Sequence, residues 1–212
     1  MKFKITPVTH YQQNCSLIIC EDTNKAAIVD PGGDVEKLIA MIAAEKVELE
    51  KVLLTHGHFD HVGGAVQIAE HFDIPIIGPA QEDEFWLDRL PGDARMFGFS
   101  PTKAFTPDQW LADDDQVNIG NLQLLVIHCP GHTPGHVVFV EKQQRLAFVG
   151  DVLFKDSIGR TDFPLGDYQT LIHSIIQKLL PLGDEFTFVP GHGPISTFGR
   201  ERLHNPFITG ES

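Results

Sequence analysis

Cysteine is scarce in this sequence, with three in 212 residues, at positions 15, 20 and 129. An odd number without the paired spacing of a zinc finger argues against a disulfide framework and favours reduced thiols in the cytoplasm. Cys15 and Cys20 flank or lie within an expected strand, so we expect both in the core. Cys129 stands near His132, where metal ligation is an alternative, but a core position is favoured.

Long apolar runs are missing as well. Residues 1–5 read MKFKI and contain no apolar segment of the kind that marks a secretory signal. No stretch approaches the roughly 20 apolar residues that a membrane-spanning helix needs. We therefore expect a cytoplasmic protein that has no membrane partner.

Basic residues are few. Lys and Arg number 16 against 29 Asp and Glu, which gives a formal net charge of -13. This charge disfavours sequence-independent binding to nucleic acid or to an anionic membrane, because both need basic patches. It also provides no long-range attraction for an anionic substrate, so metal ions or local basic contacts must bind such a substrate.

Internal repeats, Gly/Ser linkers and low-complexity tracts are absent too. At 212 residues the chain fits one domain, 1–212, with a sizeable core, and we expect a monomer. The longest interruption of the pattern, residues 91–108, is rich in Gly, Pro and Phe. A long connection without secondary structure is more often a lid or binding loop than an accident, so we predict a lid here.

Short apolar runs separated by turn residues predict strands, and apolar residues at helical spacing predict helices between them. The expected strands are residues 3–8, 15–20, 26–29, 52–54, 74–77, 122–127, 137–141, 146–149 and 186–189. The expected helices are residues 34–45, with Asp34 as N-cap, 65–72, 81–89 and 168–180. The pattern indicates an α/β fold with two strand-rich halves.

Histidine, in contrast, is concentrated in one place. Residues 55–64 read THGHFDHVGG, so His56, His58, Asp60 and His61 fall within six positions. Imidazoles packed this closely would repel one another once protonated, and they would contribute little to the stability of a hydrophobic core. Because zinc and iron accept neutral imidazole and carboxylate as ligands, the run predicts a metal site.

Three further candidates each follow a strand and a glycine turn. His132 stands in CPGHTPGH, Asp151 in FVGD and His192 in FVPGHGP. Side chains at neighbouring strand ends converge on one edge of a sheet. With the histidine run they make seven ligands, enough for two metals that share one carboxylate. The histidines at 10, 71, 128, 173 and 204 are interpreted as surface or hydrogen-bonded core residues.

These motifs resemble the signature of the metallo-β-lactamase superfamily, and within it the chain is similar to the short bacterial hydroxyacylglutathione hydrolases (glyoxalase II). The similarity runs from residues 14–15 through VDPGG at 29–33 and the histidine run to PGHGP at 190–194 and NPF at 205–207. It implies a four-layer αββα sandwich, in which two mixed sheets pack face to face with helices outside. Longer enzymes of this kind have a further C-terminal helical region that contacts glutathione; we expect none here, and hence looser substrate selection.

The resemblance also implies the ligand sets. It gives three ligands to each of two divalent ions and one ligand to both: His56, His58 and His132; Asp60, His61 and His192; and the bridging Asp151. Zinc is expected, and iron or manganese accepts the same donors. Asp30 is implied to hydrogen-bond a ligand histidine and so to fix its tautomer. His136 is either another such supporting group or a histidine that merely begins a strand.

The implied reaction is thioester hydrolysis, in which S-D-lactoylglutathione gives D-lactate and glutathione in methylglyoxal detoxification. The expected partner is thus a small glutathione thioester. Asp60 would orient the water that the ions activate, and Asp151 would join the two ions. Arg160 matches a basic residue that contacts glutathione in the family; an ion pair with Asp162 or Asp156 is the alternative.

Other activities compete with this one. Persulfide dioxygenases share the fold and the sequence GRTDF at 159–163, but use one iron. Here its ligands would be His132, Asp151 and either His56 or His58. A β-lactamase is disfavoured because zinc lactamases lack the Asp60–His61 pairing in this form and are usually secreted. A metallohydrolase with another thioester or ester substrate and a non-catalytic metal-binding module are further alternatives.

Overall fold

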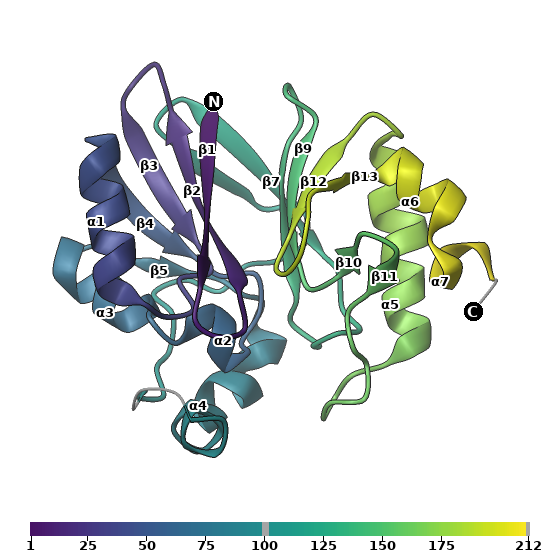
Figure 1. Cartoon of the computed structure of the whole chain (residues 1–212), viewed down its shortest axis with the longest axis horizontal. Helices are drawn as coiled ribbons and strands as arrows, with labels where there is room; N and C mark the ends of the chain where they lie inside the picture. Colours follow the sequence, from purple (N-terminus) through teal and green to yellow (C-terminus); the bar gives the residue numbers. More distant parts are fainter. Residues whose placement is uncertain (99–101, 211–212) are drawn as a thin grey trace.

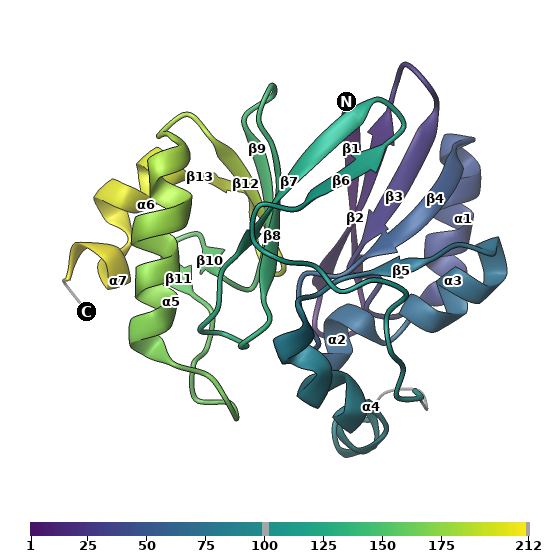
Figure 2. The same cartoon turned by 180° about the vertical axis from the view of Figure 1, so that it is seen from behind.

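The structure is a computed structural model, and it describes residues 1–98 and 102–210. Two mixed β-sheets pack face to face, and helices cover both outer faces (Figures 1 and 2). The expected α/β class and the αββα order of layers are therefore confirmed. None of the helices within these described ranges combines the length and the apolar character that crossing a membrane requires.

The first sheet has the strand order β1-β2-β3-β4-β5. Its strands are β1 (Lys2–Val8), β2 (Gln13–Cys20), β3 (Lys25–Val29), β4 (Glu48–Leu53) and β5 (Ile76–Ile77). The first three pair antiparallel, whereas β3, β4 and β5 run parallel. Parallel neighbours need a crossover, and α1 (Val35–Glu45) and α3 (Ala65–Phe72) supply it.

The second sheet has the order β13-β12-β9-β8-β7-β6. Its strands are β6 (Gln116–Ile119), β7 (Leu122–His128), β8 (Val137–Glu141), β9 (Leu146–Gly150), β12 (Thr187–Pro190) and β13 (Ser196–Thr197). β6 to β9 form an antiparallel meander, and β12 joins parallel to β9. A small ribbon of β10 (Leu153–Phe154) and β11 (Ser157–Ile158) follows β9, and α5 (Tyr168–Ser174), α6 (Phe198–His204) and α7 (Pro206–Thr209) cover the outer face.

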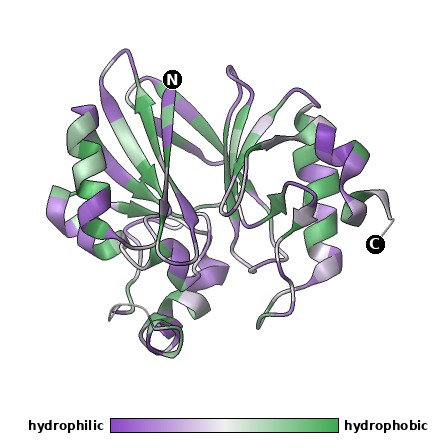
Figure 3. Cartoon of the chain, viewed as in Figure 1, coloured by the Kyte–Doolittle hydropathy of each residue, from purple (hydrophilic) through white to green (hydrophobic). Residues whose placement is uncertain are grey.

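Three apolar clusters hold the layers together. In β2, Leu17 and Ile19 pack against the outer helices, while Ile18 between them packs against the other sheet. β8 repeats this alternation, with Val138 facing the helices and Phe139 facing the first sheet. Strands buried on both faces read as continuous apolar runs. In Figure 3 hydrophobic segments lie along strands of both sheets and along the helices that cover them.

The helix after β5 is longer than the sequence predicted. A short 3-10 turn, η1 (Gln81–Asp83), leads into α4 (Glu84–Met96), which continues through Pro91. Leu87 and Ala94 lie seven positions apart on either side of the proline, and both are buried. Packing of this apolar face thus outweighs the one backbone hydrogen bond that proline removes.

The interpretation of residues 91–108 as a single long loop is therefore wrong for its first part, which completes α4. Residues 102–108 have no regular secondary structure, and residues 99–101 lie outside the described residues. Closure of this segment over a site stays a prediction.

Two helix boundaries also differ in detail. Asp34 precedes α1 but has a left-handed backbone (φ 49°) and makes no capping bond; its carboxylate instead accepts a hydrogen bond from the Thr9 N–H at 2.9 Å. The helix expected over 168–180 is continuous but changes type, because α5 passes into a π-helical turn, η2 (Ile175–Leu179), and a 3-10 turn, η3 (Leu180–Leu182). The short strands β6, β10, β11 and β13 and the helices α6 and α7 were not predicted, because each is too short to give a pattern.

Candidate metal centre

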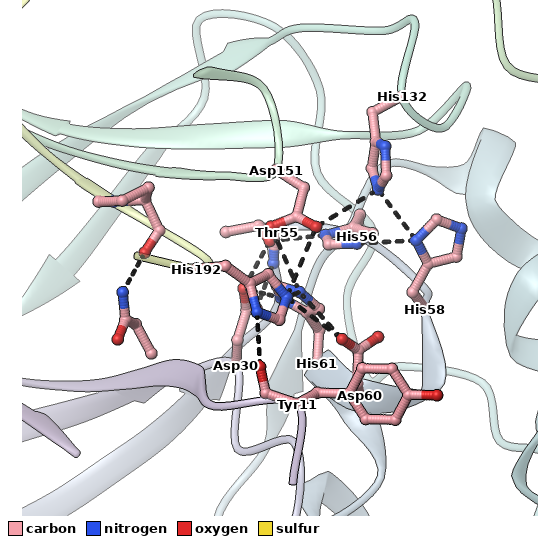
Figure 4. A network of polar contacts seen from close by, with 12 residues as sticks. Tyr11, Asp30, Thr55, His56, His58, Asp60, His61, His132, Asp151 and His192 are labelled. Carbon is pink, nitrogen blue, oxygen red and sulfur yellow. Dashed lines mark hydrogen bonds and ion pairs between the residues drawn. The ribbon is translucent and has the colours of Figure 1, made fainter. Parts of the chain in front are cut away.

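The candidate ligands come from five segments that end at the same edge of the sandwich. These are the loop after β4, the short helix α2 (Phe59–Val62), and the loops after β7, β9 and β12. In chain order they supply His56, His58, Asp60, His61, His132, Asp151 and His192. The structure brings all seven side chains together, as the strand-end pattern predicted (Figure 4).

Three histidines form a first group, which we call the first triad: His56, His58 and His132. His58 Nδ1 lies 3.1 Å from His56 Nε2 and 3.0 Å from His132 Nε2. All three residues are buried. Three imidazole nitrogens that face one common point match the nitrogen donors of a zinc or iron site.

The second triad is Asp60, His61 and His192. His192 Nε2 lies 3.2 Å from Asp60 Oδ2 and 3.4 Å from His61 Nε2, and the latter lies 3.9 Å from Asp60 Oδ2. Asp60 and His61 come from consecutive positions of α2, whereas His192 reaches the group from the opposite sheet. A carboxylate and two imidazoles again make a donor set that a divalent ion accepts.

Asp151 lies between the two triads. Its Oδ1 is 3.5 Å from His61 Nε2, and its Oδ2 is 3.7 Å from both His132 Nε2 and His192 Nε2. Oδ1 is buried and has no hydrogen-bond partner within the described part of the chain. A buried carboxylate oxygen without a donor is costly unless a cation is present, so the residues fit a pair of ions on either side of this carboxylate.

The outer ring nitrogens fix which atoms point inward. His132 Nδ1 donates to the Arg160 carbonyl at 2.7 Å, and His192 Nδ1 donates to the Tyr11 carbonyl at 3.1 Å. Because a carbonyl only accepts, the proton of each neutral ring sits on Nδ1. The lone pair then sits on Nε2, which in both residues is the atom that faces the cluster.

Asp30 does the same for two more histidines. Its Oδ2 accepts from His61 Nδ1 at 2.9 Å and from the Thr55 hydroxyl at 2.6 Å, and its Oδ1 accepts from the Thr55 N–H at 2.7 Å. Since the Thr55 hydroxyl proton goes to Asp30, its oxygen accepts from His56 Nδ1 at 3.0 Å. Asp30 thus bonds one candidate ligand directly, as the resemblance implied. It also orients His56 through Thr55, a role that was not predicted from the sequence.

His136 supports the cluster from behind. Its Nε2 accepts a hydrogen bond from the Asp151 N–H at 3.1 Å, and its ring stacks on His56 with centroids 4.7 Å apart and planes 16° apart. The ring is fully buried, and burial together with the neighbouring histidines lowers its pKa, so it stays neutral. Of the two alternatives, the geometry favours the supporting group.

The charges differ between the two triads. Burial lowers the pKa of each histidine in the first triad, so these rings are neutral at physiological pH. Burial acts the same way on His61 and His192, but Asp151 and Asp60 outweigh it and raise the pKa of both histidines. The His61 charge in turn holds the pKa of Asp151 well below its usual range, against the effect of burial. Asp151 is therefore a carboxylate.

A cavity of about 570 Å³ opens onto the cluster. Its floor includes His58, Asp60, His132, Asp151 and His192, and most of its wall is aromatic: Tyr11, Phe59, Trp86, Phe97, Phe154 and Phe163. This wall could not be predicted from the sequence, because its side chains come from four separate stretches of chain. A concave apolar wall with polar groups at one end is the usual form of a small-molecule site.

Arg160 lies at this cavity, and its guanidinium is already paired. Nε and Nη2 donate to the two Asp162 oxygens at 2.9 and 2.7 Å, and the group stands 4.3 Å from the Phe163 ring centre. Asp156, the other predicted partner, pairs instead with Arg200. The Arg160 side chain is 66% exposed.

The three cysteines take no part in the cluster. Cys15, Cys20 and Cys129 are fully buried and unpaired, as expected. Burial raises the pKa of Cys129 well above its usual range, which keeps this thiol protonated. The core interpretation of Cys129 is therefore favoured over ligation.

Gly191 is the position where a single added carbon should damage the cluster most directly. A Cβ there would lie 2.1 Å from Asp151 Oδ1 and 2.6 Å from His61 Cε1. We expect Gly191→Ala to lower metal content and to reduce hydrolytic activity by roughly 10²-fold, because ligand displacements of about 1 Å cost that much.

The matched control is Gly92→Ala in α4, where a Cβ meets nothing within 4 Å. For both variants, metal content is measured by plasma emission and stability by the melting temperature. A Gly191→Ala protein with normal metal content and normal activity would show that Asp151 and His61 are not held as described.

Buried imidazoles and carboxylates gathered at the strand ends of an αββα sandwich suggest a binuclear metal site, and they place the protein among the metal-dependent hydrolases of this fold. The family model of the metallo-beta-lactamase superfamily matches residues 8–192. The chain belongs to this superfamily.

The similar proteins agree with this membership. Hydroxyacylglutathione hydrolase GloC of Haemophilus influenzae is 47% identical over 213 residues, which cover 100% of both chains. The crystal structure of BLEG-1 B3 metallo-beta-lactamase is 39% identical with a TM-score of 0.90, covering 99% of this chain and 100% of that one. TTHA1623 in a di-iron-bound form is 34% identical with a TM-score of 0.88, covering 96% and 99%. These similarities indicate a metal-dependent hydrolase.

Proposed function

We propose that this protein is a binuclear thioester hydrolase that acts on S-D-lactoylglutathione and releases D-lactate and glutathione. The observation that carries the proposal is the floor of the cavity, where two triads of donors flank the single Asp151 carboxylate. The identity of 47% over the full length to a hydroxyacylglutathione hydrolase supports the substrate class.

The first triad would hold one ion, the second triad the other, and Asp151 would contact both. Two divalent cations supply a water with a pKa near neutrality and a positive field at the acyl oxygen. We propose zinc as the occupant; iron and manganese accept the same nitrogen and oxygen donors, and one similar structure holds two irons.

The residues of the chain would orient the attacking water and keep bulk water away from the thioester. Asp60 lies at the cavity floor. Its carboxylate would accept a hydrogen bond from the attacking water and so orient the water lone pair toward the acyl carbon. The aromatic wall excludes bulk water from the thioester. A thiolate with a pKa of about 8.5 leaves without a proton from a general acid, so the site needs no further acidic residue.

Arg160 would bind a carboxylate of glutathione in place of Asp162. We expect Arg160→Ala to raise KM for S-D-lactoylglutathione by roughly tenfold, because a charged hydrogen bond of this kind contributes about 1.5 kcal/mol. The value of kcat should change little, since the guanidinium does not contact the reacting bond. Steady-state kinetics measures both constants.

Arg145→Ala is the control for the loss of an arginine. Arg145 is 59% exposed, lies in the turn between β8 and β9 at the opposite edge of the sheet, and pairs with Glu185. An unchanged KM in Arg160→Ala, or an equal rise in Arg145→Ala, would remove Arg160 from the substrate site.

Hydrolysis of a β-lactam is a second candidate, because BLEG-1, described as a B3 metallo-beta-lactamase, is 39% identical over nearly the whole chain. It needs the same two ions and the same oriented water. A coloured cephalosporin assayed beside the thioester distinguishes them, and we expect the larger kcat/KM for the thioester.

The decisive assay uses the purified protein as isolated, with S-D-lactoylglutathione under anaerobic conditions and metal analysis of the same sample. We expect two ions per chain and release of glutathione without oxygen. One iron per chain with oxygen uptake on glutathione persulfide would instead establish a dioxygenase and overturn the proposal.

A further inference from the structure

Asp83 is a buried acid that the proposed mechanism does not use. It ends the 3-10 turn η1 just before α4, and its side chain has no exposed surface. It is not one of the candidate ligands. In the sequence it stands in the acidic run QEDE at 81–84, which is typical of a solvated helix start.

The Asp83 carboxylate joins two loops that come from different sheets. Oδ2 accepts from the Gly57 N–H and from the Thr133 hydroxyl, both at 2.8 Å, and Oδ1 accepts from the Gly135 N–H at 2.6 Å. Gly57 stands between His56 and His58, and Thr133 follows His132. The same carboxylate therefore bonds the backbone on both sides of the first triad.

The packing around these bonds is tight. A Cβ on Gly135 would lie 2.5 Å from Asp83 N and 2.8 Å from Asp83 Cβ, and a Cβ on Gly57 would lie 2.7 Å from Trp86 Cβ. Both loops are thus pressed against η1 and the start of α4. A backbone bond from Val137 N to the Thr55 carbonyl at 2.8 Å also joins the loops.

A charged Asp83 carboxylate in this buried position costs free energy, which a residue with only a packing role would not. Burial raises the pKa of Asp83 to about 7, although three donors stabilise the charged form. An apolar residue of similar volume would carry no such cost. The second triad is held by other residues. Asp60 and His61 are adjacent in α2, and Asp30 bonds His61. The Asn14 side chain donates to the Pro190 and Gly193 carbonyls on either side of His192.

We infer that Asp83 is a positioning residue that locks the loops of His56, His58 and His132 together and thereby sets the metal affinity of the first triad. This inference rests on the proposed binuclear site. Loss of a group that orients ligands lowers metal affinity by about 10- to 100-fold. Loss of the Asp83 carboxylate should therefore weaken metal binding at the first triad and leave metal binding at the second triad nearly unchanged.

The test is a Zn²⁺ titration of metal-free full-length protein in competition with a coloured chelator. In Asp83→Asn we expect the first-triad step to weaken by about 10- to 100-fold and the second-triad step to change by less than about threefold. His56→Ala and His192→Ala identify which step belongs to which triad. Excess Zn²⁺ should restore kcat, and KM should stay unchanged.

Thr133→Val is the milder variant, since it removes one of the three bonds and keeps the side-chain volume. It should weaken the same step by a smaller factor, and it serves if Asp83→Asn does not fold. Glu141→Gln is the control for a buried acid. Among the described residues, the Glu141 carboxylate accepts only a turn N–H from Gln144, at the far end of β8. This variant should leave both steps unchanged.

Equal weakening of both steps, or no weakening of either, in Asp83→Asn and Thr133→Val would overturn the inference while wild-type protein still binds two ions. Wild-type protein that binds fewer than two ions would overturn the binuclear proposal itself, and the inference with it.

Discussion

Replacing Asp151 with alanine should abolish thioester hydrolysis, with a loss in kcat/KM on the order of 10³-fold or more. Asp151 is the one carboxylate within 4 Å of both triads in the described part of the chain, so its removal separates the two positions. It also removes one of the anions that raise the pKa of His61. Assay of S-D-lactoylglutathione hydrolysis with metal analysis of the same protein measures both effects.

His56→Ala and His192→Ala should have losses of the same order, because each removes a donor from a different triad. His173→Ala is the matched control, since His173 lies exposed in α5 and outside the cluster. If activity fell as much in His173→Ala as in the variants of Asp151, His56 and His192, the losses would reflect general stability. That result would contradict the assignment of the site.

Removal of metal should lower stability as well as activity. Without cations, the lone pairs and charges of five histidines and two acids face one another in a largely buried site. Ligand at 100 times its Kd adds about 2.7 kcal/mol, which for a chain of this size is roughly 5–10 °C in melting temperature. Chelator-stripped protein should therefore melt that much lower and recover when Zn²⁺ is restored.

The Asp151→Ala protein is the control for this effect, because it lacks the carboxylate between the triads. Its melting temperature should respond less to chelator and to Zn²⁺ than that of the wild type. Stripped wild-type protein that retains its melting temperature and its activity would contradict a structural and catalytic role for the ions.

The candidate ligands could be predicted because each one sits in a local pattern. A strand, a glycine turn and a histidine or aspartate recur at His132, Asp151 and His192, and convergence at a sheet edge then follows from topology. The strands could be predicted as well, because each buried strand is a local run of apolar residues. Element boundaries shifted where packing decided them, as in α4, where burial of Leu87 and Ala94 carries the helix through Pro91.

The supporting residues could not be predicted from one sequence, since their roles depend on contacts far along the chain. Asp83 bonds residues 26 and 52 positions away, and nothing in an acidic run distinguishes it from its solvated neighbours. Thr55 could be placed beside His56, but not its bond to Asp30. The aromatic wall likewise requires the tertiary structure, because Trp86 and Phe163 meet only across the cavity.

The central claim is that two cations lie on either side of Asp151. Anomalous diffraction from crystals of the Zn²⁺-loaded protein, recorded above and below the zinc edge, tests it most directly. We expect two peaks per chain, one among His56, His58 and His132 and one among Asp60, His61 and His192, with Asp151 bound to both. A single peak, or peaks away from these side chains, would contradict it.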